Sequence, residues 1–206
     1  MSLLRVIHAK DYRRAVWKNG LGHTDEIAIY PDGSDLKTGN FLWRLSSARI
    51  ERASPFSAFP HHDRTLVILN GAGVHLTHTF DEGEDVAEVA PFAPYEFPGD
   101  IPSRCDLIDG GVQDLSVFVR KAEAESVTET LSLGEGVTQA WIPAGRFNFI
   151  YAASGNVHVE SGSEQTMLRE GETLRVDLAE PLEESRGIRL TGSGSDAELV
   201  VIAIQA

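Results

Sequence analysis

SPFSAFPHHDRTLVILNGAG, residues 54–73, places a loop, an apolar run and a turn one after another. Two prolines frame the loop, and two histidines with an Asp-Arg pair lead into the apolar run 66–69. Asn70-Gly71 ends the run with a strong hairpin signal, because these residue types tolerate positive φ most readily. The stretch therefore predicts a strand over residues 64–69, with the run 74–80 as its hairpin partner.

A weaker copy of this unit lies in the C-terminal half. FNFIYAASGNVHV, residues 147–159, parallels RTLVILNGAGVHL, residues 64–76: each has a strand, a turn with glycine, and then Val-His-aliphatic. The other apolar runs are short and separated by Gly, Pro, Asn and Asp, with little helical periodicity, which is typical of an all-β sandwich or barrel. We therefore predict a double jelly roll with halves 1–121 and 122–206. Residues 122–131 are acidic and fit either a short helix or a linker.

Length and charge narrow the class of protein. The chain has 206 residues, a formal net charge of −13 and one cysteine. An acidic surface repels nucleic acid and anionic lipid, so we expect no nucleic-acid partner and no membrane partner. No apolar stretch approaches the roughly 20 residues that span a bilayer. A single cysteine suits a reducing compartment, so the expected location is cytoplasmic.

Histidines in a predicted β-barrel raise the question of a metal centre. A cupin binds its metal through an H-x-H pair, a glutamate and a later histidine. In this sequence the glutamate position holds Arg64, the later histidine position holds Pro102, and residues 57–60 contain no histidine. In the second half the glutamate position holds Asn148. We therefore expect no metal ligands and no cofactor.

Arg64 suggests a different use of the same position. A guanidinium inside a barrel requires a partner, because an unpaired buried charge is costly. Its planar donors suit a carboxylate held through two hydrogen bonds. The alternative is an internal salt bridge with Asp63, Asp114 or Glu26, which would make Arg64 structural. Strand alternation places Arg44 inward as well, where it either faces the cavity or extends to its rim.

Two further groups are candidates for the walls of this cavity. Trp17, Lys18 and Asn19 form a turn-rich segment that either is exposed or covers the cavity, with the indole for stacking and the other two for polar contacts. His61 and His62 are loop residues at the expected mouth. No Ser-His-Asp or Cys-His spacing and no phosphate-binding glycine loop is recognisable in the sequence.

Five ordered motifs resemble the HutD/Ves family of bacterial cupin-like proteins: WKNGLGHTDEIA, FLWRLSSARI, SPFSAFPHHDRTLVILNGAG, FPGD and DLSVFVRK. The resemblance is strong over residues 1–121 and weak beyond. It implies a bicupin fold without catalytic metal, and a pocket for a small ligand such as formate, urocanate or N-formylglutamate. It also implies a regulatory or sensing role in histidine utilisation.

The leading hypothesis is a non-metal bicupin that binds a small carboxylate or imidazole-containing metabolite and assists histidine catabolism. The expected ligand-binding residues are Arg64, Asp63, Asp114, Trp17, Lys18, Asn19, Arg44, Glu26 and His62, with Asp63 and Asp114 orienting Arg64. No catalytic residue is assigned.

Two other hypotheses stay open. One is a metal-independent isomerase or hydrolase that uses Glu26, His61 or His62 as acid or base. The other is a protein-binding module whose second half is the interaction surface. A homodimer through paired sheet edges is a further expectation, although no stretch of the sequence specifies it.

Overall fold

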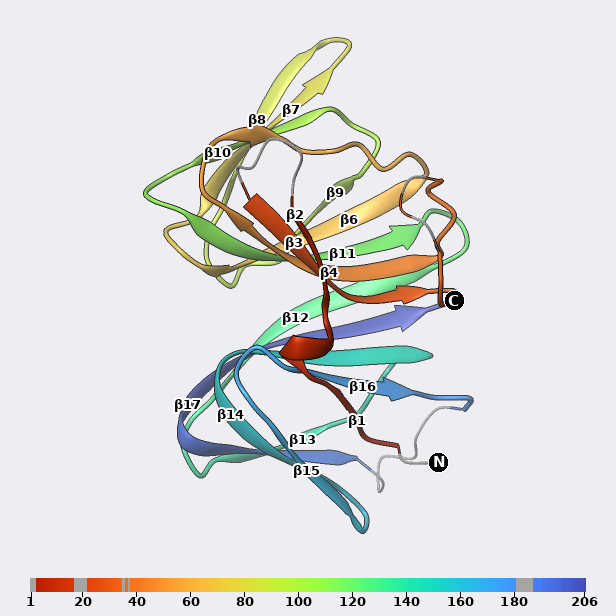
Figure 1. Cartoon of the computed structure of the whole chain (residues 1–206), viewed down its shortest axis with the longest axis vertical. Coiled ribbons are helices and arrows are strands. Elements are labelled where there is room, and N and C mark those ends of the chain that lie inside the picture. The colour runs from red at the N-terminus through yellow and green to blue at the C-terminus, as the bar shows by residue number, and fades with distance from the viewer. Residues whose placement is uncertain (1–2, 17–21, 35, 37, 181–186) are drawn as a thin grey trace. The chain divides into compact units, whose positions relative to one another are not determined.

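The computed structural model describes residues 3–16, 22–34, 36, 38–180 and 187–206. The chain forms two compact units, Tyr12–Glu125 and a second one that combines Met1–Asp11 with Ser126–Ala206. Both consist mainly of β-strands (Figure 1), with one short 3-10 helix at Ala9–Asp11, which confirms the predicted all-β class. The expected division after residue 121 differs from the observed one, because the first eleven residues belong with the C-terminal strands.

The Tyr12–Glu125 unit contains two antiparallel sheets. In spatial order, the six-stranded sheet consists of β2 (Arg13–Val16), β3 (Gly22–Tyr30), β4 (Trp43–Ile50), β11 (Val112–Arg120), β6 (His62–Asn70) and β9 (Tyr95–Pro98). The four-stranded sheet consists of β5 (Ser54–Pro55), β10 (Ser103–Leu107), β7 (Val74–Phe80) and β8 (Gly83–Val89). Residues of both sheets form one buried core: Ile50, Leu66, Ile68, Val74, Leu76, Val89, Phe97, Cys105 and Val112.

The predicted hairpin between β6 and β7 is wrong. β6 pairs with β11 and β9, whereas β7 pairs with β8 and β10 in the other sheet. Alternate apolar residues before and after the turn, such as Ile68 and Val74, enter the same core. The chain therefore crosses from one sheet to the other at Gly71. This glycine has φ of +102°, and a Cβ there would lie 2.8 Å from the carbonyl oxygen of Gly111.

The second unit contains one seven-stranded antiparallel sheet. Its main order is β1 (Arg5–Ile7), β16 (Thr173–Asp177), β14 (Phe147–Ser161), β17 (Ile188–Gln205) and β12 (Glu125–Leu133), while β13 (Thr138–Trp141) pairs with β17 and β15 (Glu164–Leu168) with β14. Figure 1 shows β1 beside β16, with Val6 opposite Leu174. Leu4 and Val6 pack into this unit's core, which explains why the first residues belong to it.

Two local expectations also differ from the structure. Residues 147–161 form one strand, β14, whose register against β17 shifts on either side of Ser154, where two strands and a turn were expected. Residues 125–133 form strand β12 with alternating burial, so most of the acidic segment 122–131 is a strand and not a helix, although the boundary between the two units falls within it.

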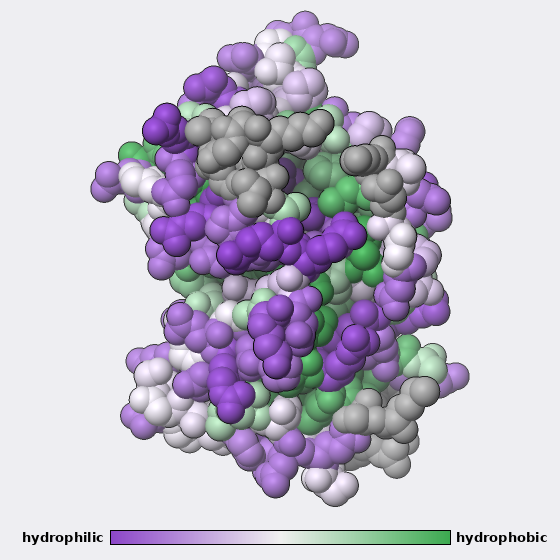
Figure 2. Space-filling view, in the orientation of Figure 1, coloured by the Kyte–Doolittle hydropathy of each residue, from purple (hydrophilic) through white to green (hydrophobic). Residues whose placement is uncertain are grey.

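Hydrophilic side chains (purple) cover most of the face shown in Figure 2, with smaller hydrophobic areas between them. The large apolar side chains are mainly in the two cores, with rare exceptions such as Phe80 and Val127. Within the described ranges, no helix has the length and apolar character needed to cross a bilayer.

Candidate functional site

A cavity of about 600 Å³ lies in the Tyr12–Glu125 unit. Its floor is the inner face of the six-stranded sheet, because alternate residues of β4 and β11 point to the same side. β5 and the loop that follows it supply the opposite wall. The lining residues are Ala15, Thr24, Leu36, Arg44, Ser46, Ala48, Ile50, Ser54, Pro55, Phe56, Ser57, Phe59, Arg64, Asp114, Ser116 and Phe118.

Strand register brings the polar lining residues together. Phe118 on β11 lies between Arg44 on β4 and Arg64 on β6, as its direct partner in both pairings. Ser116 occupies the next inward position of β11, and Asp114 the one after it. The floor therefore carries two guanidinium groups at one end and a carboxylate two inward positions away.

Arg64 is the central charged residue of the cavity. Its side chain is buried, and its Nε and Nη2 both donate to Ser116 Oγ, over 3.3 and 2.9 Å. Its Cζ lies 4.1 Å from the ring centroid of Phe56 and 5.0 Å from that of Phe118, within cation–π range. Burial lowers the pKa of Arg64 to about 10, with Asp114 opposing the change, so the group is charged at neutral pH. Among the described residues, no acceptor occupies its remaining N–H donors.

Asp114 is the partner of Arg64, at a distance of 3.7 Å from its Oδ2 to Arg64 Nη2. The carboxylate is 1% exposed, and its Oδ1 accepts the N–H of Ala48 over 2.9 Å. Within the described part of the chain, no donor forms a hydrogen bond with Oδ2 or with the buried Oγ of Ser54, which also lines the cavity. Burial raises the pKa of Asp114 to about 6, although Arg64 and the Ala48 N–H oppose this.

Arg44 is more fully paired than Arg64. Its Nε donates to Glu26 over 3.0 Å and its Nη1 donates to Ser46 Oγ over 3.0 Å. Burial lowers the pKa of Arg44, and the hydrogen bond with Glu26 counteracts this. Glu26 itself is shared with Arg13, at 3.3 Å. A β-bulge at Ile27 on β3 follows Glu26 directly, and bulges commonly redirect neighbouring side chains.

The sequence did not predict that aromatic side chains form part of the cavity wall. Phe56 and Phe59 line the cavity, and the ring centroids of Phe59 and Phe118 are 4.5 Å apart. Both phenylalanines belong to the loop 56–59, which precedes β6. Their closeness to Arg64 in the sequence is the signal that could have placed them in the cavity wall. Rings of this kind exclude water and strengthen the electrostatic interactions of a guanidinium.

Asp63 and His62 are not where the sequence predicted. Strand alternation turns Asp63 away from Arg64, and its carboxylate lies 3.6 Å from Lys121 Nζ. The ring of His62 stacks on Phe41, and its nitrogens lie 2.9 and 3.0 Å from the backbone oxygens of Pro60 and Phe41. Neither residue lines the cavity, so Asp63 does not orient Arg64 and His62 serves local structure.

The other candidates divide into two groups. Arg64, Arg44 and Asp114 line the cavity as expected from alternation, and Glu26 lies behind Arg44. His61 is exposed, with φ of +65°. The segment Trp17, Lys18 and Asn19, expected as a lid or an exposed turn, lies outside the described residues.

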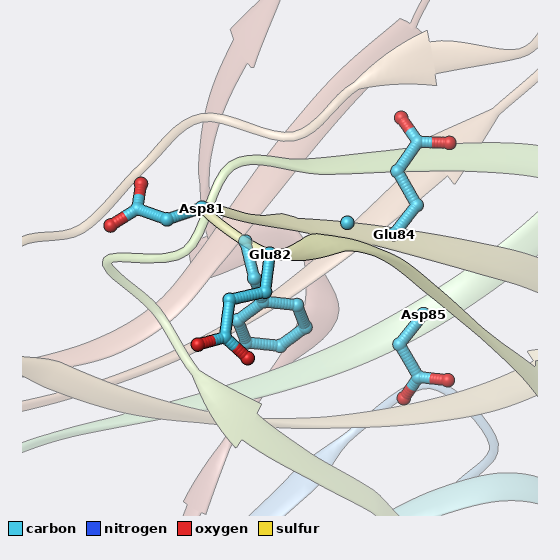
Figure 3. Close-up of a pocket in the computed structure, with 6 residues that line it drawn as sticks. Asp81, Glu82, Glu84 and Asp85 are labelled. Atoms are coloured by element: carbon cyan, nitrogen blue, oxygen red, sulfur yellow. The ribbon is translucent and has the colours of Figure 1, made fainter.

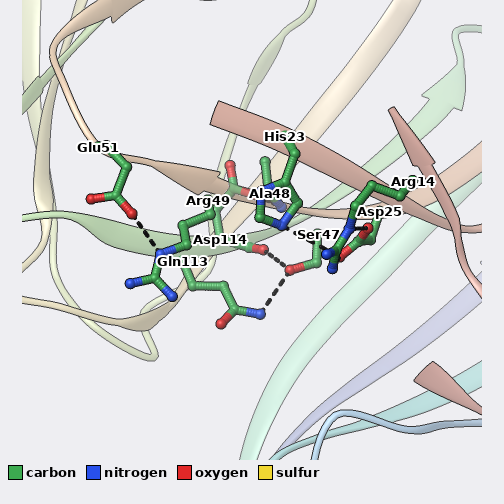
Figure 4. Close-up of polar contacts among 9 residues, drawn as sticks. All are labelled: Arg14, His23, Asp25, Ser47, Ala48, Arg49, Glu51, Gln113 and Asp114. Atoms are coloured by element: carbon green, nitrogen blue, oxygen red, sulfur yellow. Dashed lines mark hydrogen bonds and ion pairs between the residues drawn. The ribbon is translucent and has the colours of Figure 1, made fainter. Parts of the chain in front are cut away.

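The opposite face of the same sheet is polar and internally paired (Figure 4). A hollow of about 280 Å³ lies there, and Arg14 donates two hydrogen bonds of 2.7 Å to Asp25. Arg49 pairs with Glu51 at 2.6 Å. Both guanidinium groups are exposed and already have carboxylate partners, so this face is a solvated surface.

A second hollow lies at the turn between β7 and β8. Its lining includes Asp81, Glu82, Glu84 and Asp85. Figure 3 shows their carboxylates pointing in different directions. Within the described ranges, no three His, Cys, Asp or Glu side chains are close enough to hold a metal ion together.

Cys105 lies in the core beside the cavity and is fully buried. Burial raises the pKa of its thiol to about 12, with Asp114 adding to the effect. Because the thiolate is the reactive form, we expect a thiol reagent at pH 8 to modify the native protein at least ~100-fold more slowly than the urea-unfolded chain. Absorbance of the released thiolate measures both rates. Equal rates would contradict the buried position.

The chain resembles bacterial proteins over nearly its whole length. The HutD family model matches residues 9–193. An uncharacterised 21.2 kDa protein in the hutC 3′ region of Pseudomonas putida is 30% identical over 201 residues, which cover 97% of this chain and 99% of that protein. The protein Ves of Cronobacter sakazakii is 32% identical over 107 residues, or 52% of this chain and 55% of Ves.

Solved structures also resemble the chain over nearly its whole length. A conserved protein of unknown function from Pseudomonas aeruginosa PAO1 superimposes with a TM-score of 0.86 at 28% identity and full coverage of both chains. HutD from Pseudomonas fluorescens SBW25, solved in a formate condition, gives 0.76 at 28% identity, covering 98% of this chain and 100% of that chain. Hazelnut vicilin shares the cupin-like fold with a TM-score of 0.70 at 8% identity, covering 96% of this chain and 84% of that chain. By the extent of the family match, the chain belongs to the HutD family.

Proposed function

We propose that the cavity binds a small carboxylate metabolite, and that the protein has an accessory or regulatory role in histidine catabolism. One observation carries the proposal: a buried, charged Arg64 has unused N–H donors beside a cavity of about 600 Å³. A planar guanidinium presents pairs of N–H donors in the geometry that a carboxylate accepts. The ligand class comprises formate, urocanate and N-formylglutamate. The link to histidine utilisation is supported by the Pseudomonas putida relative, which is described as a protein in the hutC 3′ region.

The surroundings of Arg64 support a ligand of mixed character. Phe56, Phe59 and Phe118 offer apolar surface, while the hydroxyl groups of Thr24 and Ser57 offer polar contacts at other points of the lining. Small-molecule sites commonly combine an apolar lining with a few polar groups that fix orientation. A cavity of this volume accommodates molecules larger than formate, such as urocanate.

Two wider features belong to the same proposal. We take the two β-rich units to be the halves of a bicupin, as the likeness to vicilin and oxalate decarboxylase supports at the level of fold. The location is taken to be cytoplasmic, because the single cysteine is buried as a free thiol. An enzymatic alternative has less support: Glu26 is paired with two arginines and His62 faces backbone carbonyls.

Thermal denaturation with a panel of ligands tests the proposal. Formate, acetate, urocanate and N-formylglutamate are each compared with the corresponding neutral amide. A ligand that binds only the folded state at a hundredfold excess over Kd adds about 2.7 kcal/mol of stability, or roughly 5–10 °C in Tm for a chain of this size. We expect a concentration-dependent rise for at least one carboxylate and none for its amide. Equal shifts for acid and amide, or no shift at all, would contradict a carboxylate site.

A further inference from the structure

The charged groups inside the cavity are balanced before any ligand enters. Arg64 faces Asp114, and Arg44 is hydrogen-bonded to Glu26. All four residues are buried, with exposed fractions between 1% and 8%, whereas Arg13, the second partner of Glu26, is largely exposed to solvent and lies outside this set. A carboxylate that enters therefore adds a negative charge to a set of two positive and two negative groups. In a site of low dielectric constant, an uncompensated charge of this kind is expensive.

Asp114 is the group in the best position to compensate the added negative charge, by binding a proton. Its Oδ1 is held by the Ala48 N–H, whereas no described donor forms a hydrogen bond with Oδ2. A proton placed on Oδ2 therefore breaks no hydrogen bond that the described residues make. It converts the carboxylate nearest Arg64 into a neutral acid, which leaves the guanidinium free to pair with the ligand.

The other groups around Asp114 do not titrate in its place. They are Arg64 on β6, Arg44 on β4 and Cys105 on β10, while Glu26 on β3 lies behind Arg44. Both guanidinium groups stay charged near neutral pH, and the Cys105 thiol stays neutral because burial raises its pKa to about 12. No histidine or lysine is among the described residues that line the cavity.

We propose that the cavity takes up its carboxylate together with one proton, which is held on Asp114. This rests on the proposed function, since it assigns the proton balance of the same site. The ligand enters as the anion and the solvent supplies the proton, so the complex carries the same net charge as the empty site. Binding is then tighter at low pH, and a monocarboxylate binds more tightly than a dicarboxylate, whose second charge has no compensating group. Within the proposed class this favours formate and urocanate over N-formylglutamate, which carries two carboxylates.

The affinity for acetate between pH 5 and pH 8 tests the inference, with acetamide as the uncharged control and ligand-detected NMR as the measurement. By linkage, the slope of log Kd against pH equals the number of protons taken up on binding. Free Asp114 loses its proton near pH 6, and acetate, which as a simple carboxylic acid titrates below about pH 5, is almost fully ionised above pH 6, where the slope is measured. We therefore expect a constant Kd below pH 6 and a rise of about tenfold for each pH unit above it.

Two matched variants assign the proton to a residue. Asp114→Asn imitates the neutral acid, so its Kd for acetate should be independent of pH and at least ~10-fold lower than that of the native protein at pH 8. Asp63→Asn makes the same chemical change beside Arg64 but outside the cavity, and it should keep the native pH dependence.

The outcomes separate the two proposals. Absence of binding at pH 5 by every carboxylate of the panel would overturn the carboxylate site itself. Binding with a constant Kd from pH 5 to pH 8 would overturn proton uptake and leave the carboxylate site in place. A native pH dependence that persists in Asp114→Asn would show that the proton is held by another group. The native titration decides the first two outcomes even if Asp114→Asn does not fold.

Discussion

Arg64→Leu is expected to abolish measurable carboxylate binding. The substitution removes the guanidinium that lies over the Phe56 ring and, with it, the unused N–H donors of Arg64. Loss of one partner from a buried, hydrogen-bonded charge pair costs roughly 2–5 kcal/mol, which raises Kd by at least about 30-fold. Titration of the native and variant proteins with the tightest carboxylate of the panel, at pH 5.5, measures the change.

Arg49→Leu is the matched control for Arg64→Leu. Arg49 lies on the same sheet, but it points to the opposite face and pairs with Glu51 (Figure 4). We expect its Kd to equal that of the native protein, because exposed ion pairs contribute little. Arg64→Lys adds a finer test: it keeps the charge and loses the planar pair of donors, so an intermediate affinity is expected. Unchanged affinity in Arg64→Leu would place the ligand elsewhere.

Gly71→Ala is expected to cost the Tyr12–Glu125 unit about 3–5 kcal/mol of its free energy of unfolding. The residue has φ of +102°, a conformation that a side chain disfavours. The added Cβ would also lie 2.8 Å from both the backbone oxygen of Gly111 and a methyl group of Val112. Backbone atoms of β-structure do not yield easily, so the strain and the close contact add together.

Gly33→Ala separates these two contributions. Gly33 has φ of +83°, and a Cβ there would meet nothing within 4 Å. It should cost only the conformational part, about 1–2 kcal/mol. Urea denaturation followed by tryptophan fluorescence measures both variants, in a Trp141→Phe background so that the signal reports on the Tyr12–Glu125 unit. Equal losses for the two variants would mean that the crossing at Gly71 is not tightly packed.

Strand periodicity was enough to predict the charged floor of the cavity. Side chains alternate in every strand, so Arg44 and Arg64 had to face the same side as the apolar residues near them, and Asp114 shares a face with Ser116 and Phe118. This local rule holds whatever the partner strand is. It therefore succeeded without any knowledge of the sheet order.

The failures concern information that is not local. A positive φ at Gly71 serves a hairpin and a crossing between sheets equally well, so the turn could not reveal which one occurs. The partner of Asp63 is Lys121, far along the sequence, and no pattern near Asp63 indicates it. Residues 125–133 look like an acidic linker until their neighbour β17 is known, because a strand at a sheet edge buries only alternate residues.

The pairing of β1 with β16 has a consequence for the order in which the protein is built. On the ribosome, residues 5–7 are made long before residues 173–175, against which they pair. The Tyr12–Glu125 unit contains all the strands of both its sheets by the time residue 125 is added, so it is able to fold while synthesis continues. The second unit is complete only after its last strand, β17, has been made, and β1, which is made before the whole Tyr12–Glu125 unit, then joins it. Its folding is therefore the slower, later event, governed by closure of the longest loop in the chain.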